Sequence, residues 1–260
     1  MPHASHGRHA KPRTPLLRSV AATAALGTAA AAISVLAAGT AQAASGDHAA
    51  GAVMAAQSAT PHFPVPVRIG NAHQILTVQA HGSYATVTAW QFGPTGWHRV
   101  FWTTAARVGA HGITNGATRH QNTYTTPTGT YSITQGFGNG ANPGTRMPYH
   151  PVTRHDWWVE DPSSAYYNQL RTDTQGGFHL TEAGYYGSEH LINYPTQYHN
   201  ALVINFNMNP AVRGRGAGIF LHDLSASGGP TAGCVAVPAG VMTRIMQWIN
   251  PAAHPVIAIG

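Results

Sequence analysis

The sequence predicts a mainly β domain with one C-terminal helix packed on it and a long, loop-rich cap. Three observations lead to this fold class. Short segments rich in β-branched and aromatic residues alternate with turn signals along most of the chain. One stretch near the C-terminus has the periodicity of an amphipathic helix. A segment from Phe137 to Asn200 has weak periodicity but many aromatic residues.

The first 43 residues have the three parts of a secretory signal peptide. A basic start is followed by an uncharged, alanine-rich run from about Ser19 to Gly39, and Ala41-Gln42-Ala43 forms a small-residue cleavage pattern. We expect cleavage there, which would leave a mature protein outside the cytoplasm, secreted or at the cell wall, with no membrane attachment. The apolar run is nearly long enough to cross a bilayer, so a retained anchor is the alternative.

The mature chain is close to neutral, which argues against a nucleic-acid partner. All eight acidic residues follow Ala43 and four of the fourteen basic residues precede it, so the mature net charge is 10 − 8 = +2 rather than +6. Residues 44–66 are small, polar and proline-containing, as expected of a flexible linker. Residues 67–260 have the length of one domain with its own core.

Eight segments of this domain are predicted to be strands, and one is predicted to be a helix. The strands are Ile75–Ala80, Tyr84–Gln91, Trp97–Thr103, Thr130–Thr134, Ala201–Asn207, Gly218–Asp223, Gly233–Val237 and Pro255–Ile259. Glycine-containing turns separate the first three, and a Thr-Pro-Thr-Gly turn precedes the fourth. The helix is expected from Pro238 to Ile249, because proline suits a first helical turn, one face is apolar and Pro251 follows its end.

The segment from Phe137 to Asn200 is expected to be an ordered cap beside a functional site. Long loops inside compact domains are usually lids or binding loops. Its aromatic side chains argue against a disordered insertion.

The single cysteine, Cys234, is the main candidate for chemistry. Exported proteins normally pair their cysteines, so an odd thiol suggests an intermolecular bond or a thiol kept for its reactivity. A buried, inert cysteine is the alternative. His222 ends an apolar strand twelve residues earlier, and a Gly/Ser/Pro-rich loop joins the two.

These residues suit a nucleophilic site. A neighbouring imidazole raises the thiolate fraction or takes the thiol proton during attack. Small residues before the nucleophile, here Ala232-Gly233, let backbone N–H groups form an oxyanion hole. Asp223 would orient the imidazole through its carboxylate or its backbone carbonyl.

In these motifs the chain resembles the L,D-transpeptidase (YkuD-like) catalytic domain family. The segment Thr126-Pro127-Thr128-Gly129-Thr130-Tyr131 matches the family's early Thr-Pro-x-Gly-x-aromatic motif. Phe220-Leu221-His222 and Thr231-Ala232-Gly233-Cys234 match its histidine strand and its Ser/Thr-x-Gly-Cys motif. The resemblance covers about Asn71 to Gly260 and implies a mixed β-sandwich.

The resemblance also implies an activity in cell-wall organisation. Cys234 would be the nucleophile, His222 the base, Gly233-Cys234 the oxyanion hole and Asp223 the orienting residue. The substrates would be peptidoglycan stem peptides, cleaved before the terminal D-Ala and joined into 3→3 cross-links through a Cys thioester. With water as acceptor the enzyme would be an L,D-carboxypeptidase. The resemblance implies no metal or organic cofactor, and carbapenem-type β-lactams as inhibitors.

The sequence departs from the family pattern around the nucleophile, which concerns substrate binding. Many members have His where this chain has Ala232, and Arg or Asn where it has Ala236. The expected substrate contacts are therefore drawn from four other places. They are Thr231 before the nucleophile, Arg213 in a glycine-flanked loop, Tyr186 of the Tyr185-Tyr186 pair and His190 of the Glu189-His190 pair.

Two other classes of protein compete with this interpretation. A zinc peptidase or amidase would use ligands such as His155-Asp156, His179 and His190, but the chain lacks a tight metal-binding spacing. A non-catalytic wall-binding module would line a groove with aromatic residues such as Trp157, Trp158, Tyr166 and Tyr167. Such a module gives no reason to keep a His–Cys pair.

Overall fold

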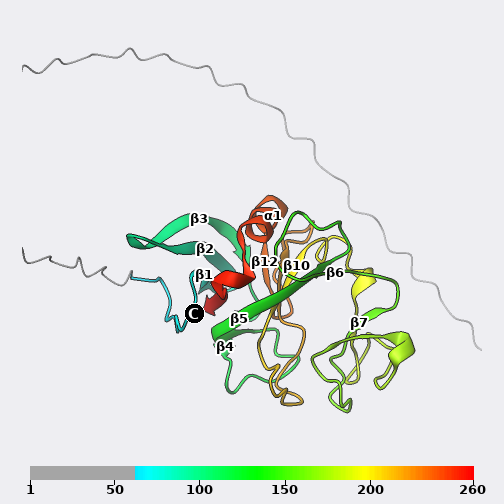
Figure 1. The fold of residues 1–260 in the computed structure, drawn as a ribbon. Helices are drawn as coiled ribbons and strands as arrows, with labels where there is room; N and C mark the ends of the chain where they lie inside the picture. The colour runs from blue at the N-terminus through cyan, green and yellow to red at the C-terminus, as the bar shows by residue number, and fades with distance from the viewer. Residues whose placement is uncertain (1–61) are drawn as a thin grey trace, which may run out of the picture. The chain divides into compact units, whose positions relative to one another are not determined.

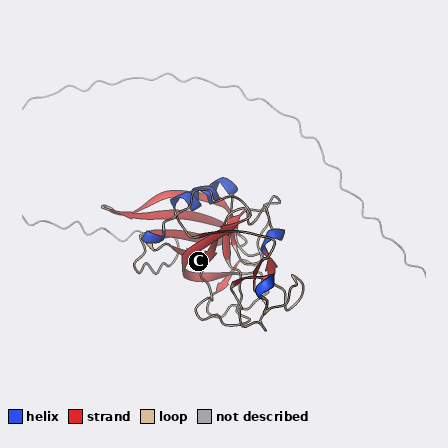
Figure 2. Cartoon of the chain, turned by 45° about the vertical axis from the view of Figure 1, so that its right-hand side comes forward, coloured by secondary structure: helices blue, strands red, loops and turns tan. Residues whose placement is uncertain are grey.

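The computed structural model describes residues 62–260, which form mainly β-strands (Figures 1 and 2). The predicted signal peptide and most of the predicted linker lie outside the described residues. At the end of that linker, Phe63 packs edge-on against Trp90 and Val65 is buried. Packing of the domain therefore begins a few residues before position 67.

The strands predicted from the sequence are present, with shifted ends. They are β1 (Gln74–His81), β2 (Tyr84–Gly93), β3 (Gly96–Arg107), β5 (Thr126–Gly138), β10 (Ala201–Ile204), β11 (Phe220–Asp223), β12 (Val235–Val237) and β13 (Val256–Ile259). The Thr-Pro-Thr-Gly segment was expected to be a turn, and this was wrong. It lies inside β5, where it pairs in parallel with β4 (Ile113–Asn115).

These strands form one mixed sheet whose order departs widely from the chain order. The order is β10-β11-β12-β3-β2-β1-β13-β5-β4. β1–β13 and β11–β12 are parallel pairs, and β1–β2 and β2–β3 are antiparallel. β5 also pairs with β10, so the hydrogen-bonded path returns to the strand where it began. The expected mainly β, mixed fold is confirmed.

The apolar side chains of these strands fill one core, which the buried face of α1 (Ala239–Trp248) completes; α1 is the one α-helix of residues 62–260 and lies at the top of the domain in Figure 1. Met242, Ile245 and Met246 are its fully buried residues. The helix was expected from Pro238 to Ile249, and its observed ends differ by one residue each. Burying one apolar face against a sheet is what stabilises so short a helix.

The segment from Phe137 to Asn200 is ordered and forms a second, smaller layer, visible around the β7 label in Figure 1. It contains a three-stranded sheet of order β8-β7-β9. The strands and 3-10 helices of this layer are β7 (Asp156–Trp158), β8 (Leu170–Thr172), η1 (Asp173–Gln175), β9 (Glu189–His190) and η2 (Leu191–Asn193). In the same segment, β6 (Tyr149–Pro151) pairs in parallel with β5 of the large sheet; η3 (Pro251–Ala253) lies near the C-terminus. Trp158, Leu191 and Tyr198 of the cap pack against Phe137 and Phe220 of the large sheet.

Candidate active site

Cys234 lies directly before β12 with its side chain 7% exposed. Its Sγ accepts a hydrogen bond from the backbone N–H of Phe220 at 3.3 Å and donates to the carbonyl of Gly218 at 3.3 Å. Both partners belong to the neighbouring β11 and the residues that lead into it. The thiol is therefore fixed against the backbone of the histidine strand.

His222 lies on the same face of the sheet as Cys234. β11 and β12 are parallel, and the register pairs Leu221 with Val235, so Cys234 is level with Phe220. His222 is two residues further along and shares the face of Phe220, because side chains alternate along a strand. The strand spacing and rise place the two Cα atoms roughly 8 Å apart. Both side chains line one cavity of about 370 Å³.

The His222 ring is oriented by a backbone group. Its Nδ1 lies 2.7 Å from the carbonyl oxygen of Asp223. A carbonyl can only accept, so Nδ1 carries the proton and the neutral ring presents the lone pair of Nε2. Of the two modes weighed from the sequence, the observed one uses the carbonyl of Asp223. Its carboxylate instead accepts from the backbone N–H of Asn200 at 2.9 Å.

The electrostatics keep both members of this pair uncharged. Burial lowers the pKa of His222 to about 4, although its bond to Asp223 opposes this shift. Burial also raises the pKa of the Cys234 thiol, and the carboxylates of Glu189 and Glu160 raise it further. The resting state is thus a neutral thiol and a neutral imidazole that line the same cavity, with the thiol hydrogen-bonded to the Gly218 carbonyl. This arrangement suits general-base removal of the thiol proton during attack rather than a preformed thiolate.

Gly233 and Thr231 shape the backbone before the nucleophile. Gly233 has φ +152°, and a Cβ there would lie 2.8 Å from Arg119 Nη2, so glycine is required. Its N–H, an expected oxyanion donor, donates to Thr231 Oγ1 at 3.1 Å. Thr231 Oγ1 in turn donates to the carbonyl of Cys234 at 2.7 Å. Thr231 therefore holds the nucleophile loop, and it also lines the cavity of His222.

A second, smaller cavity of about 110 Å³ lies on the other side of Cys234. Three ionisable side chains line it, namely Arg119, Glu160 and Glu189, and burial raises the pKa of Glu160 and that of Glu189, the latter to about 7. Arg119 is 4% exposed, and its Nε donates to the carbonyl of Thr125 at 2.8 Å. Sequence reasoning missed Arg119 and Glu160, because each lies more than 70 residues from Cys234 and outside any recognised motif.

The strand register in the cap separates the Glu189-His190 pair. β7 and β9 are antiparallel, with Trp158 opposite Glu189 and Trp157 opposite His190. Trp158 packs on Phe220 in the cluster that contains Cys234, and Glu189 lines both cavities beside the thiol. His190 faces the other way, where it stacks on Trp157 at 4.3 Å between ring centroids.

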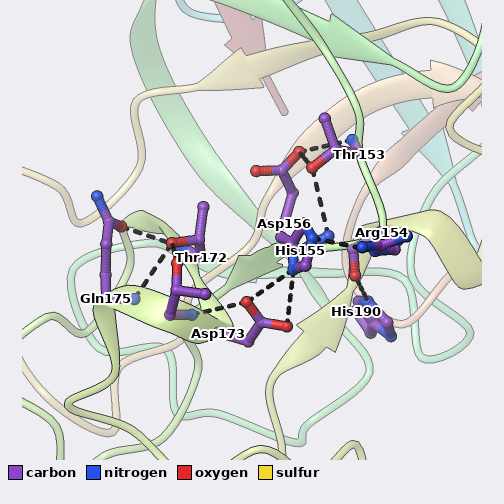
Figure 3. A network of polar contacts seen from close by, with 9 residues as sticks. Thr153, Arg154, His155, Asp156, Thr172, Asp173, Gln175 and His190 are labelled. Carbon is purple, nitrogen blue, oxygen red and sulfur yellow. Dashed lines mark hydrogen bonds and ion pairs between the residues drawn. The ribbon is translucent and has the colours of Figure 1, made fainter.

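Figure 3 shows the polar network that surrounds His190. Its Nε2 donates to the carbonyl of Arg154 at 2.7 Å, and Arg154 Nε donates to His155 at 3.0 Å. His155 in turn faces the carboxylate of Asp173. Figure 3 therefore shows His190 as part of the cap's own packing.

The remaining expected substrate contacts lie outside both cavities of Cys234. Tyr186 is exposed and packs against His179, and Arg213 is exposed in its loop. Together with His190 they stay predictions, and the geometry gives them no added support.

Two further properties concern residues 62–260 only. Within this range, no group of three His, Cys, Asp or Glu side chains is placed to hold a metal ion. The histidines considered as zinc ligands have separate partners: His179 pairs with Asp161 and His155 with Asp173. In the same range, no helix has the length and apolar character needed to cross a membrane.

Comparison with known proteins gives a family and several distant structures. No curated protein matches the chain. Bd1075 of Bdellovibrio bacteriovorus shares 13% identity with a TM-score of 0.38, over 73% of this chain and 48% of that one. The helical cell shape determining protein Pgp2 of Campylobacter jejuni shares 11% with a TM-score of 0.36, over 73% and 48%. The chain thus spans about half the length of these proteins.

A match to a family model gives the family of the chain. The model of the L,D-transpeptidase catalytic domain, YkuD, matches residues 93–257, a range that contains both His222 and Cys234. With more than half of its length matched, the chain belongs to the YkuD family of L,D-transpeptidase catalytic domains.

Proposed function

We propose that this protein is an exported L,D-transpeptidase with Cys234 as its nucleophile. The family acts on peptidoglycan peptides and is inhibited by β-lactams, which connects the chain with the cell wall. The observation that carries the proposal is that Cys234 and a neutral His222 line one cavity on one face of the sheet. The imidazole has its Nε2 lone pair available, because Nδ1 is held by the carbonyl of Asp223.

The first half-reaction transfers the stem peptide to the enzyme. Cys234 Sγ attacks the carbonyl that joins the L-centre of the third stem residue to the terminal D-Ala. As the S–C bond forms, the thiol proton passes to His222 Nε2. The C–N bond then breaks, the same proton goes to the departing D-Ala amine, and a thioester remains.

A backbone donor is needed for the oxyanion of this step. The N–H of Gly233 is engaged by Thr231 in the resting state. The N–H of Cys234 itself, or that of Gly233 after Thr231 turns away, would serve.

The second half-reaction consumes the thioester. An amine of a neighbouring stem gives the 3→3 cross-link, and water gives the L,D-carboxypeptidase product. The site is proposed to act outside the cytoplasmic membrane, after removal of the signal peptide near Ala43. Wall fractionation of expressing cells and the N-terminal sequence of the mature protein test this location.

Intact mass spectrometry tests the nucleophile. The mature protein should gain one acyl mass from a purified tetrapeptide stem and one inhibitor mass from a carbapenem, each on the peptide that contains Cys234. Cys234→Ala should gain neither mass while keeping its fold by circular dichroism. Release of D-Ala by Cys234→Ala at the wild-type rate would rule out the proposal.

A further inference from the structure

Glu189 is placed next to the reacting pair, and the first half-reaction has no use for it. It lines both cavities that flank Cys234. Tyr198 donates from its hydroxyl to Glu189 Oε2 at 2.5 Å. The ring of Tyr198 meets the His222 ring edge-on, with 5.4 Å between centroids. A hydrogen bond and an aromatic contact thus fix the carboxylate beside the catalytic histidine.

The surroundings of Glu189 favour a cation or a proton. Glu160 lines the smaller cavity with it, and a Cβ at Gly218 would collide with Glu160 Oε1, so this carboxylate lies against the segment that binds Sγ. Glu182 and Tyr198 affect the pKa of Glu189, and Glu189 in turn raises the pKa values of Tyr194, Tyr198 and Cys234. None of these is a cation. Arg119 lines the smaller cavity too, and its positive charge acts on Glu160, whose pKa it lowers.

The acceptor amine requires one more proton transfer than water does. A side-chain amine has a pKa near 10.4, so it arrives as an ammonium ion. One proton must leave before its lone pair can attack the thioester. A second leaves as the N–C bond forms and the C–S bond breaks, and it returns through His222 to the thiolate. A water molecule is already neutral and loses a proton only as it attacks the thioester. Hydrolysis therefore needs His222 alone as a base.

We infer that Glu189 is a catalytic residue of the second half-reaction, which binds the acceptor's ammonium group and takes its first proton. Glu189 then holds that proton as a neutral carboxylic acid and releases it to solvent when the cross-linked product leaves. Conversion of a buried ammonium–carboxylate pair to an uncharged amine and acid is favoured where water is excluded. The inference rests on the proposed function and names its acceptor class, a primary amine that is charged at neutral pH.

The test compares how the acyl-enzyme divides between acceptors. Wild-type protein, Glu189→Gln and the control Asp173→Asn are acylated with a tetrapeptide stem, and products are counted by mass spectrometry. The acceptors are water, a second stem with a free side-chain amine, and hydroxylamine, which is uncharged at neutral pH. Asp173 is a partly exposed cap residue that lines neither cavity and does not affect the pKa of Glu189.

Glu189→Gln should lower the ratio of cross-linked to hydrolysed product by roughly 10²-fold, the usual worth of a general base. It should keep the hydroxylamine product and the acyl-enzyme, and Asp173→Asn should behave like wild type. An unchanged ratio in Glu189→Gln would overturn the inference. Equal loss of the hydroxylamine and stem products would overturn it too, because it would mean that Glu189 only shapes the cavity.

The experiment distinguishes failure of the proposed function from failure of the role assigned to Glu189. A wild-type protein that forms no acyl-enzyme would overturn the proposed function itself, whereas an acyl-enzyme with an unaffected product ratio overturns only the role of Glu189. If Glu189→Gln does not fold, Glu189→Asp replaces it. The shorter carboxylate should give a smaller drop in the same ratio and again spare hydroxylamine.

Discussion

At the scale of single residues, the uncharged state of the Cys–His pair decides how the thiol is activated. The pKa of Cys234 is raised and that of His222 is lowered, so neither side chain ionises the other at rest. His222→Ala should therefore reduce acylation by roughly 10²–10⁴-fold, through loss of the base. Single-turnover acylation followed by mass spectrometry measures this. His98→Ala, an exposed histidine on β3, is the control. Acylation that persists in His222→Ala would make the ring structural.

The carboxylates of Glu189 and Glu160 raise the pKa of the Cys234 thiol, and this effect can be measured. Glu189 follows burial as a cause of the raised pKa of Cys234. Glu189→Gln should then lower the thiol pKa, so that alkylation by iodoacetamide becomes fast at a lower pH than in wild type. The alkylation rate as a function of pH is the measurement, with Asp173→Asn as the control. Identical profiles for Glu189→Gln and wild type would show that no charge at Glu189 reaches the thiol.

Asp223 has a carboxylate that the orientation of His222 does not use. The side chain is 2% exposed, its Oδ1 has no hydrogen-bond partner in the described range, and burial raises its pKa to about 6. A raised acid pKa favours the folded state at low pH, and this contribution is lost as pH rises from about 4 to about 6.

Asp223→Asn should therefore be at least as stable as wild type at pH 7. Its advantage should shrink as pH falls to 4, where the wild-type carboxyl is protonated. Acylation should stay within about 10-fold of wild type, because the backbone carbonyl still holds Nδ1. Denaturant unfolding at the two pH values and single-turnover acylation check both parts. A loss of acylation as large as that of His222→Ala would assign a role to the carboxylate.

At the scale of elements, the periodicity of the sequence predicted where most strands lie but not which strands pair with each other. β1, β2 and α1 were predicted almost to the residue, because each carries a clear period bounded by turn residues. β3 and β5 are longer than predicted, since pairing with neighbouring strands extends them through polar and Pro-Gly sequence. The short cap strands have three residues or fewer, which is below the length at which a period can be recognised.

In the candidate site, too, local sequence pattern predicted some residues, whereas others depended on how the strands pair. Cys234 was found as the one cysteine of the sequence, and His222 as the histidine that ends an apolar segment twelve residues earlier. The structure adds that their strands pair directly. Within the Glu189-His190 pair, the choice of His190 as the substrate contact depended on register. A shift of one residue reverses which side chain faces the thiol, and only the pairing of Trp158 with Glu189 fixes it.

The cap depends on a buried carboxylate for its local stability. Asp161 is fully buried and accepts from Ser163 and from both nitrogens offered by His179, Nδ1 and the backbone N–H. Burial alone would raise its pKa, but these hydrogen bonds lower it to about 2. The stabilisation is present above pH 4 and is lost as pH falls from 4 towards 2.

Asp161→Asn should loosen the cap by about 1–3 kcal/mol, because an amide cannot accept all these bonds. Hydrogen exchange of residues 160–180 measures the loss. Asp173→Asn, at the partly exposed pair with His155, is the control and should change exchange less. Equal exchange in Asp161→Asn and wild type would show that the loop is held by its apolar contacts.

At the scale of the whole molecule, the site depends on strands from both ends of the domain. The nucleophile strand β12 pairs with β3, and the cap packs on β5 and β11. The last strand, β13, lies between β1 and β5 and so joins the first hairpins to the remainder of the sheet. Neither a fragment that ends before β13 nor one that begins after β3 contains a complete sheet.

The strand β13 therefore offers a test of whether the domain unfolds as one unit. Ile257 is 0% exposed and lies opposite both Leu76 of β1 and Tyr131 of β5, whereas its neighbour Val256 is only half-buried. Ile257→Ala should cost about 2–5 kcal/mol of unfolding free energy and Val256→Ala about 1 kcal/mol or less, because only the first leaves a cavity in the core. Denaturant curves followed by tryptophan fluorescence and by acylation of Cys234 should shift together in Ile257→Ala. Loss of the sheet signal while the thiol still reacts with substrate would mean that the site is stable without β13.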